Sequence, residues 1–94
     1  MHYVYLIRSI NFPNKTYVGL TDNISDRLNA HNHGYSLHTK TYRPWKIEVV
    51  ITFNNKLQAA AFEKYLKSHS GRSFASKRFW TKSELADTQT QSKK

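Results

Sequence analysis

Arg27 and His31 are the first residues whose types and spacing could do chemistry. They belong to a helical stripe that also contains Ile24 and Leu28, so a cation and an imidazole stand where core residues are expected. Their spacing of four residues places both on one helix face, where they can reach a single anion together. Two ordinary roles remain open: the Arg27 stem could cover the core, and His31 could stabilise the C-terminal end of the helix.

Glu63 is the second unusual residue. The chain contains six Asp and Glu residues, and this one lies on the apolar side of a predicted helix with Ala59, Phe62 and Leu66. A carboxylate on such a face is costly to desolvate unless a cation meets it. The cation could be Arg27, in a structural ion pair, or a divalent metal, which one carboxylate can hold together with water and phosphate oxygens. The residues by themselves favour the ion pair.

Tyr5 and Tyr17 are the third feature, because both fall on a predicted hairpin. Aromatic residues on a hairpin usually serve core or cross-strand packing. If the two share a face, however, their phenol groups point to the place where the helix brings Arg27 and His31. Gly19 would then leave open surface beside them.

The elements that must position these side chains follow from periodicity and turn residues. Residues 3–8 alternate, NFPNK is a turn signal and TYVGLT resumes the pattern, which predicts a β-hairpin over residues 2–21. Asp22 or Asn23 can cap the following helix, which runs to about His31 and ends near Gly34. A basic loop, expected to be exposed, continues to Pro44.

The second half of the domain is predicted to contain a strand, a helix and a short basic segment. Residues 45–53 form the strand, with Ile47, Val49, Ile51 and Phe53 on one face. The helix begins at Asn54 or Asn55 and carries Glu63. In the basic segment that follows Gly71, three aromatic residues are expected to close the core: Phe74, Phe79 and Trp80. We expect one domain over residues 1–81 and a flexible tail over residues 82–94.

Composition narrows the class of partner. Fifteen Lys and Arg against six Asp and Glu leave a net charge of +9, which favours a polyanion such as nucleic acid over an ordinary solvated surface. The absence of cysteine excludes disulfides and thiolate zinc sites. No signal peptide or membrane segment is visible, so we expect a cytoplasmic protein with no membrane partner. The basic residues expected along a phosphate path are Lys15, Lys40, Arg43, Arg72, Lys77 and Arg78.

The order of these residues resembles the GIY-YIG nuclease family. The resemblance lies in YVY at 3–5, YVG at 17–19, Arg27 with His31, and a helical Glu63, and it extends from Tyr3 to about Trp80. The ending GRSFASKRFW resembles the single-domain bacterial subgroup of the family, which is UPF0213-like or like the N-terminal domain of the excision-repair incision subunit. Tyrosine at position 3 replaces a glycine of the family motif, and Val18 replaces an isoleucine; neither change removes a reacting group.

The resemblance implies an α/β (α+β) domain in which helices flank a three-stranded antiparallel sheet, with the active site on one face of the sheet. It implies metal-dependent endonuclease activity, with Mg²⁺ or Mn²⁺, on DNA that is structured, branched or damaged, as in DNA repair. The alternative is a non-catalytic or partner-dependent nucleic-acid-binding module. We expect a monomer without a small-molecule cofactor.

The resemblance also implies roles for the five residues. Tyr17 would be the general base or a base relay, Tyr5 would hydrogen-bond within the site and Glu63 would bind the metal. Arg27 would steady the phosphate, with His31 beside it. A phenol has an ordinary pKa near 10, so it can act as a base at neutral pH only beside cations or by passing its proton on, for example to His31. A late polar residue of the family is not identified; the candidates are Ser70, Ser73 and Ser76.

Overall fold

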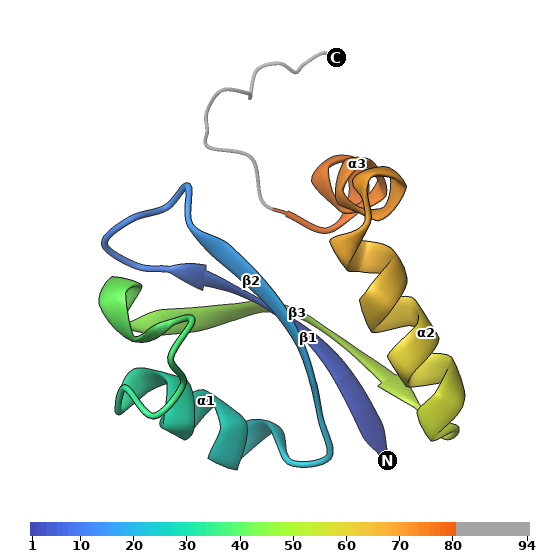
Figure 1. Cartoon of the computed structure of the whole chain (residues 1–94), viewed down its shortest axis with the longest axis horizontal. Helices are drawn as coiled ribbons and strands as arrows, with labels where there is room; N and C mark the ends of the chain where they lie inside the picture. The colour runs from blue at the N-terminus through green and yellow to red at the C-terminus, as the bar shows by residue number, and fades with distance from the viewer. Residues whose placement is uncertain (81–94) are drawn as a thin grey trace.

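The structure is a computed structural model that describes residues 1–80. An antiparallel sheet with strand order β2-β1-β3 is flanked by helices, which confirms the predicted fold class (Figure 1). The predicted tail, residues 82–94, lies outside the described residues. The elements are β1 (His2–Ser9), β2 (Thr16–Thr21), α1 (Ile24–Asn32), the 3₁₀ helix η1 (Lys40–Tyr42), β3 (Trp45–Phe53), α2 (Lys56–Lys67) and α3 (His69–Arg78).

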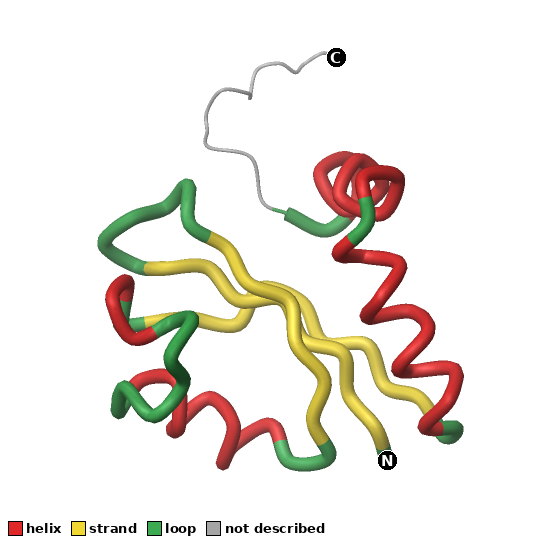
Figure 2. The backbone as a smooth tube through the Cα atoms, viewed as in Figure 1, coloured by secondary structure: helices red, strands yellow, loops and turns green. Residues whose placement is uncertain are grey.

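The sheet has a core on each of its faces, because successive side chains of β1 point to opposite sides. Val4 and Leu6 are buried with residues of α2 and α3, whereas Tyr5 and Ile7 are buried on the side of α1. Figure 2 shows the sheet running between α1 on one side and α2 with α3 on the other. The predicted alternation of residues 3–8 is therefore confirmed, and it separates the helix that carries Arg27 from the helix that carries Glu63.

A β-bulge in β3 corrects the prediction that Ile47, Val49, Ile51 and Phe53 share one face. Leu6 pairs with Val49 but the next residue, Ile7, pairs with Ile47, so Glu48 is an extra residue in β3. An extra residue reverses the alternation beyond it, and Ile47 therefore joins the core on the α1 side. The side chain of Glu48 accepts a hydrogen bond from Arg8 Nε over 2.6 Å.

The predicted helix ends are confirmed by the capping contacts. The Asn23 side chain accepts a hydrogen bond from the backbone N–H of Asp26, and Asn55 caps α2 in the same way through Gln58. Gly34 follows α1 with φ +79°, the left-handed conformation that favours glycine after a helix. The basic segment after Gly71 belongs to α3 and its end, and its aromatic residues pack against the core as predicted: Phe74, Phe79 and Trp80.

The sequence led us to expect an exposed loop between α1 and β3, but part of this loop is buried. Ser36 and Thr39 are buried, because the chain folds inward through η1 before it enters β3. The Trp45 indole N–H donates to the carbonyl of Thr39 over 2.8 Å, which fixes this turn against the sheet. Among residues 1–80, no helix has the length and apolar character needed to cross a membrane.

Candidate active site

The hydroxyl of Tyr5 is the centre of a buried polar network. It accepts a hydrogen bond from Arg27 Nε over 3.0 Å and lies 2.9 Å from His31 Nε2. Gly19 is the cross-strand partner of Tyr5, and a Cβ built on it would overlap the phenol. The expectation that Gly19 leaves open surface is therefore wrong: the Tyr5 ring fills that space. The close approach lets a side chain of the central strand reach two residues of α1.

His31 connects this network to Thr39. Its Nδ1 lies 2.6 Å from Thr39 Oγ1, and both residues have no exposed surface. Because the Tyr5 oxygen accepts from Arg27, its own proton is available to donate to His31 Nε2, so that Nδ1 carries the imidazole proton. Thr39 then accepts from His31 and donates to the carbonyl of Ser36 at 3.5 Å. In this tautomer each hydrogen bond from Arg27 Nε through Tyr5, His31 and Thr39 to the Ser36 carbonyl has one donor and one acceptor.

Burial and charge set the protonation states of the three central residues. Burial lowers the pKa of His31 to about 4, with the positive charge of Arg27 adding to the effect, so His31 is neutral at neutral pH. Burial likewise raises the pKa of Tyr5, opposed by its hydrogen bond and charge interaction with Arg27. The hydrogen bond with Tyr5 raises the pKa of Arg27, and Tyr17 contributes a smaller effect. The site thus contains a neutral phenol, a neutral imidazole and a charged guanidinium.

Tyr17 lies beside this network at the sheet edge. Its ring centroid is 5.2 Å from that of His31 and 6.4 Å from that of Tyr5. On its other side, Lys67 Nζ lies 5.4 Å from the centroid of the Tyr17 ring and 2.7 Å from Glu63 Oε2. Lys67 therefore links the phenol of Tyr17 to the carboxylate of Glu63.

The cation that meets Glu63 is thus Lys67, four residues later on α2, and the ion pair with Arg27 that the sequence favoured is wrong. The charge of Glu63 nonetheless contributes to the raised pKa of Tyr5, which places the carboxylate near the same network. Because α1 and α2 cover opposite faces, these side chains meet at the β2 edge and not on a single face of the sheet.

A divalent metal ion could bind at this edge only if the substrate supplied some of its ligands. No group of three or more His, Cys, Asp or Glu residues that could hold a metal occurs within residues 1–80. Glu63 is partly exposed, with 21% of its side-chain surface accessible, so it can offer an oxygen to an ion from solvent. Mg²⁺ commonly binds one or two carboxylates and takes its remaining ligands from water and phosphate. The donor set therefore suits a hard cation that arrives with a phosphate group.

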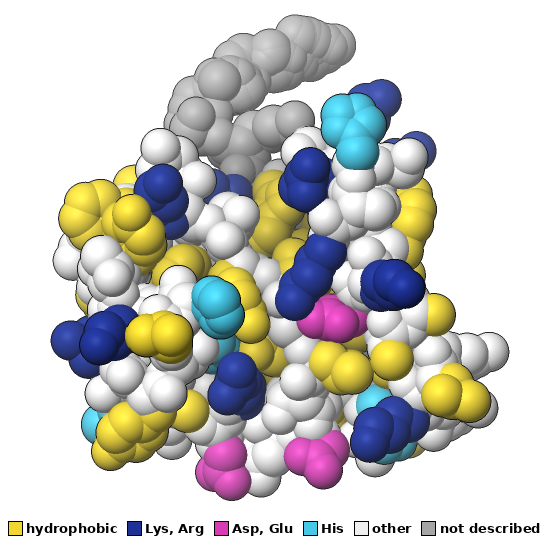
Figure 3. All heavy atoms as spheres, in the orientation of Figure 1, with side chains coloured by type: hydrophobic (Ala, Val, Ile, Leu, Met, Phe, Trp, Pro, Cys, Tyr) yellow, Lys and Arg dark blue, Asp and Glu magenta, His cyan; other side chains and the backbone are white. Residues whose placement is uncertain are grey.

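The predicted phosphate-path residues divide into two groups. Lys15 lies over the Tyr42 ring at 5.1 Å, Lys40 begins η1 and Arg43 lies against Gly34, so these three lie near η1 and the end of α1. The other three are on α3, and of the six only Arg72 lines the pocket that contains Tyr17: Arg72, Lys77 and Arg78. On the face of the molecule that Figure 3 shows, lysine and arginine side chains are spread widely, with few acidic side chains between them.

Two residues of the site were not among those chosen from the sequence. Lys67 could have been found from its spacing of four residues from Glu63 on a helix, which is the ordinary spacing of an ion pair. Thr39 had no such signal, because it lies in a polar loop among other hydroxyl residues. Of the serines considered for the late polar position, Ser76 lines the pocket with Tyr17, and Ser70 and Ser73 do not.

Comparison with known proteins agrees with this geometry. The family model described as the GIY-YIG catalytic domain matches residues 1–78. A structure-specific endonuclease subunit SLX1 from Malassezia globosa is 38% identical over 73 residues, which cover 72% of this chain but 16% of that protein. A UPF0213 protein of Clostridium perfringens is 34% identical over 68 residues, covering 71% of each chain. Another, from Staphylococcus haemolyticus, is 34% identical over 70 residues, covering 73% of this chain and 83% of its own length.

The chain thus spans a small part of the SLX1 relative and most of the two UPF0213 relatives. The family match covers all five candidate residues and both strands of the hairpin that carries the two tyrosines. The chain therefore belongs to the GIY-YIG family of endonucleases, as the order of residues in its hairpin, first helix and second helix predicted.

Proposed function

We propose that this protein is a metal-dependent endonuclease that hydrolyses phosphodiester bonds in structured, branched or damaged DNA. The observation that carries the proposal is the meeting of Tyr17, Arg27 and the Glu63–Lys67 pair around one sheet edge. These groups supply a candidate base, a permanent cation and a candidate metal ligand. Hydrolysis of a phosphodiester uses all three functions. The cation and the metal neutralise the phosphate charge, and the base takes a proton from the attacking water.

Arg27 is suited to hold the phosphate. Its hydrogen bond with Tyr5 raises its pKa, so the guanidinium is charged throughout the physiological range. That bond uses Nε, and a guanidinium carries further N–H donors on its terminal nitrogens. The contact with Tyr5 also fixes the orientation of the guanidinium plane. Arg27 therefore presents preorganised donors to a phosphate oxygen that gains charge in the transition state.

Tyr17 is the proposed base, and Tyr5 is not. Tyr5 is buried, has a raised pKa and already donates to His31, so it serves to orient Arg27 and His31. Tyr17 lies at the edge with Lys67 over its ring, and it also interacts with Arg27, whose pKa it helps to raise. The Tyr17 hydroxyl is thus the phenol of the site that is left to receive a proton from attacking water.

Glu63 would hold a magnesium or manganese ion, which when bound stabilises negative charge on the phosphate and on the leaving oxygen. The carboxylate projects from the second turn of α2 and is kept in place by Lys67. Its other neighbours on that side of the helix, Ala59 and Leu66, are buried in the core, which anchors the backbone beneath it. Glu63 is thus a single ligand on a rigid element beside the candidate base.

The test is a panel of labelled flap, junction, single-stranded and duplex DNA, incubated with Mg²⁺, Mn²⁺ or EDTA. We expect cleavage with metal and none in EDTA. Glu63→Gln and Tyr17→Phe should each lower the cleavage rate by about 10²- to 10⁴-fold while DNA binding persists. Asp22→Asn and Tyr35→Phe, at exposed positions, are matched controls that should keep the full rate. Cleavage by the Glu63→Gln protein at the wild-type rate would refute the proposed role.

A partner-dependent module is the second candidate, and one observation favours it. The SLX1 relative is described as a subunit, and the chain matches a small part of it. A folded, pure protein that binds DNA but cuts none of the four substrates with either metal would favour this alternative. The substrate panel therefore separates the two candidates without further variants.

A further inference from the structure

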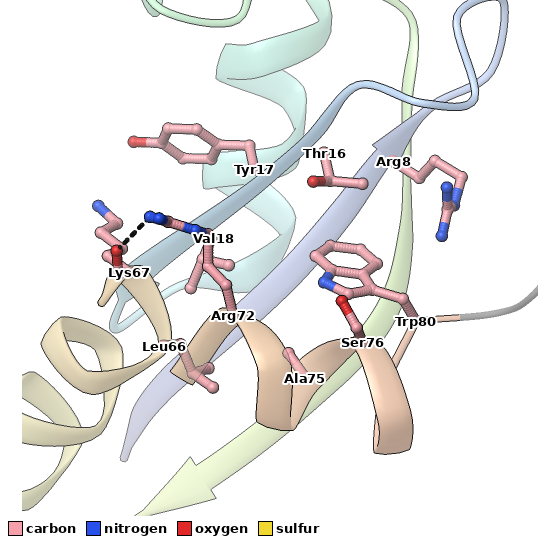
Figure 4. A pocket seen from close by; sticks show the side chains of 10 residues that line it. All are labelled: Arg8, Thr16, Tyr17, Val18, Leu66, Lys67, Arg72, Ala75, Ser76 and Trp80. Carbon is pink, nitrogen blue, oxygen red and sulfur yellow. Dashed lines mark hydrogen bonds between the residues drawn. The ribbon is translucent and has the colours of Figure 1, made fainter. Parts of the chain in front are cut away.

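A pocket of about 470 Å³ lies next to Tyr17, between the edge strand β2 and helix α3. Figure 4 shows that it extends from Tyr17 and Lys67 at one end to the Trp80 indole at the other. Its volume falls within the range of about 300–1,000 Å³ that is usual for small-ligand sites. Its polar and aromatic lining residues are Arg8, Thr16, Tyr17, Lys67, Arg72, Ser76 and Trp80.

The chemistry of the lining suits a nucleotide. Arg8, Lys67 and Arg72 are cations, and no acidic residue is among the ten lining residues. Arg8 and Lys67 form ion pairs with Glu48 and Glu63, so Arg72 contributes most to the preference of the pocket for an anion. Thr16 and Ser76 add hydroxyl groups that can bond a sugar or a base edge. An aromatic surface next to cations is the combination by which proteins hold single nucleotides of a nucleic-acid strand.

Trp80 provides a prepared surface for a base. The Arg8 guanidinium, held by Glu48 over 2.6 Å, lies over part of its ring at 5.3 Å from the centroid, so a base would contact the part of the indole that lines the pocket beside Arg8. The indole is partly buried and packs against the core, so it does not need to be ordered when a ligand binds. A base stacking on a fixed ring gains contact area at little entropic cost.

We propose that this pocket binds one unpaired nucleotide of the DNA strand, next to the phosphate that is cleaved. The proposal rests on the proposed function, because Tyr17 belongs both to the pocket and to the candidate active site. The nucleobase lies against Trp80, and the phosphate that joins this nucleotide to its neighbour lies toward Lys67 and Arg72. Arg72 is oriented for this by the hydrogen bond from its Nη1 to the carbonyl of Lys67 over 2.8 Å.

The substrate class follows from this assignment. A base within a duplex is stacked on its neighbours and paired, so it cannot enter a side pocket until both contacts are broken. A flap, a single-stranded end or a branch point offers an unpaired base without that cost. The pocket therefore selects DNA with an unpaired nucleotide adjacent to the cleaved bond and discriminates against intact duplex.

The first experiment measures binding without metal, so that it does not depend on cleavage. Short single-stranded DNA is titrated into the protein in EDTA, and tryptophan emission and fluorescence anisotropy are recorded. Trp45 is 4% exposed, so quenching by a stacked base should come from Trp80. Trp80→Phe should abolish the quenching yet keep most of the affinity, because phenylalanine can still stack. Trp80→Ala should weaken binding about tenfold.

Arg72→Gln tests the charged end of the pocket and does not disturb the core, since Arg72 is exposed. We expect it to weaken binding about fivefold and to reduce the salt dependence of affinity. Lys56→Gln, an exposed cation at the start of α2, is the matched control and should change affinity less than twofold. Equal effects of the two substitutions would overturn the proposal.

The second experiment uses the wild-type protein, so it does not depend on any variant folding. A flap substrate is made in a series in which one nucleotide at a time, on either side of the cleaved bond, lacks its base. One position should reduce both binding in EDTA and cleavage about tenfold, and the others should have little effect. If no abasic position changes binding and cleavage is normal, the proposed nucleotide pocket is refuted and the proposed function still stands. Base-dependent quenching without cleavage of any substrate refutes the function and leaves the pocket standing.

Discussion

The Tyr5 hydroxyl occupies the space that a side chain on Gly19 would take, directly across the pairing of β1 with β2. Glycine is therefore needed at this position for the space it leaves to the Tyr5 ring, and not for its backbone conformation. It lets the phenol lie flat over the edge strand and reach Arg27 and His31. A glycine and a tyrosine that are far apart in the sequence thus form one structural unit, and the orientation of Arg27 depends on both.

Gly19→Ala should displace the Tyr5 ring. The added Cβ overlaps the hydroxyl and the ring carbons, and the buried ring has little room to move. We expect the free energy of unfolding to fall by about 1–3 kcal/mol, the usual cost of overpacking. The cleavage rate should fall as well, because Arg27 and His31 lose their common partner. Urea denaturation and the flap-cleavage rate measure the two effects.

A double-mutant cycle separates the steric cause from an effect on the edge strand itself. In the background of Tyr5→Ala, the added Cβ no longer meets the phenol that makes its three closest contacts, so the added substitution should cost less than about 0.5 kcal/mol. Additive losses in the double variant would show that Gly19 is needed for the backbone and not for the Tyr5 ring.

Thr39 should control the tautomer of His31. Thr39→Val removes the oxygen that lies 2.6 Å from His31 Nδ1 and leaves a buried donor without an acceptor. The loss should be about 1–3 kcal/mol of unfolding free energy. In the wild type, ¹⁵N chemical shifts of the imidazole should report the form with the proton on Nδ1. In Thr39→Val we expect a mixture of tautomers.

Thr41→Val is the matched control, since Thr41 is exposed in η1, the short helix that directly follows Thr39. It should leave both the imidazole shifts and the stability within about 0.5 kcal/mol of the wild type. Thr39→Ser, which keeps the hydroxyl, should restore the wild-type shifts. A wild-type spectrum with the proton on Nε2 would contradict the direction of the hydrogen bonds assigned here.

Much of the fold could be predicted because its signals are local. The alternation of β1, the Asn23 cap and the glycine after α1 each depend on a few adjacent residues, and each was confirmed. That Arg27 and His31 lie on the same face of α1 followed from helical spacing alone. Their meeting with the two tyrosines needed the family resemblance, since local periodicity does not place a helix relative to a hairpin.

The features that could not be predicted depend on contacts between distant segments. Glu48 reads as an outward polar residue of an alternating strand, and only the pairing with β1 reveals the bulge that turns Ile47 to the other face. In the sequence Thr39 is one of several hydroxyl residues in a polar loop, and only the folded structure shows its contact with His31. Glu63 was correctly marked as needing a cation, but the choice among nearby cations depends on geometry that spacing leaves open.

His31 should make the stability depend on pH between about 4 and 6.5. Burial lowers the pKa of this imidazole from 6.5 to about 4 in the folded state. Between those values the unfolded chain binds a proton that the folded protein does not, so stability falls as the pH falls through this range. Above 6.5 the contribution is fully present, and below 4 it is lost. The total is up to about 3 kcal/mol, measured by urea denaturation at a series of pH values.

His38→Gln is the control for this slope, because His38 is exposed in the loop before η1. It should keep the pH dependence of the wild type. His31→Gln should be less stable at pH 7 and should lose most of the dependence between pH 4 and 6.5. A slope that survives in His31→Gln would assign it to other groups.

Lys67 should compete with metal for Glu63. Its ammonium lies 2.7 Å from the carboxylate, so a metal ion that binds Glu63 must displace or share that contact. The pair is partly exposed, and such a contact contributes about 0.2–1 kcal/mol. Lys67→Met should therefore lower the Mn²⁺ concentration for half-maximal cleavage by a factor of about 1.5–5, measured with saturating DNA so that weaker DNA binding does not obscure the effect. Lys64→Met, on the same helix without this ion pair, should leave that concentration unchanged. An increase in the Lys67→Met protein would show instead that Lys67 supports metal binding by holding Glu63 in position.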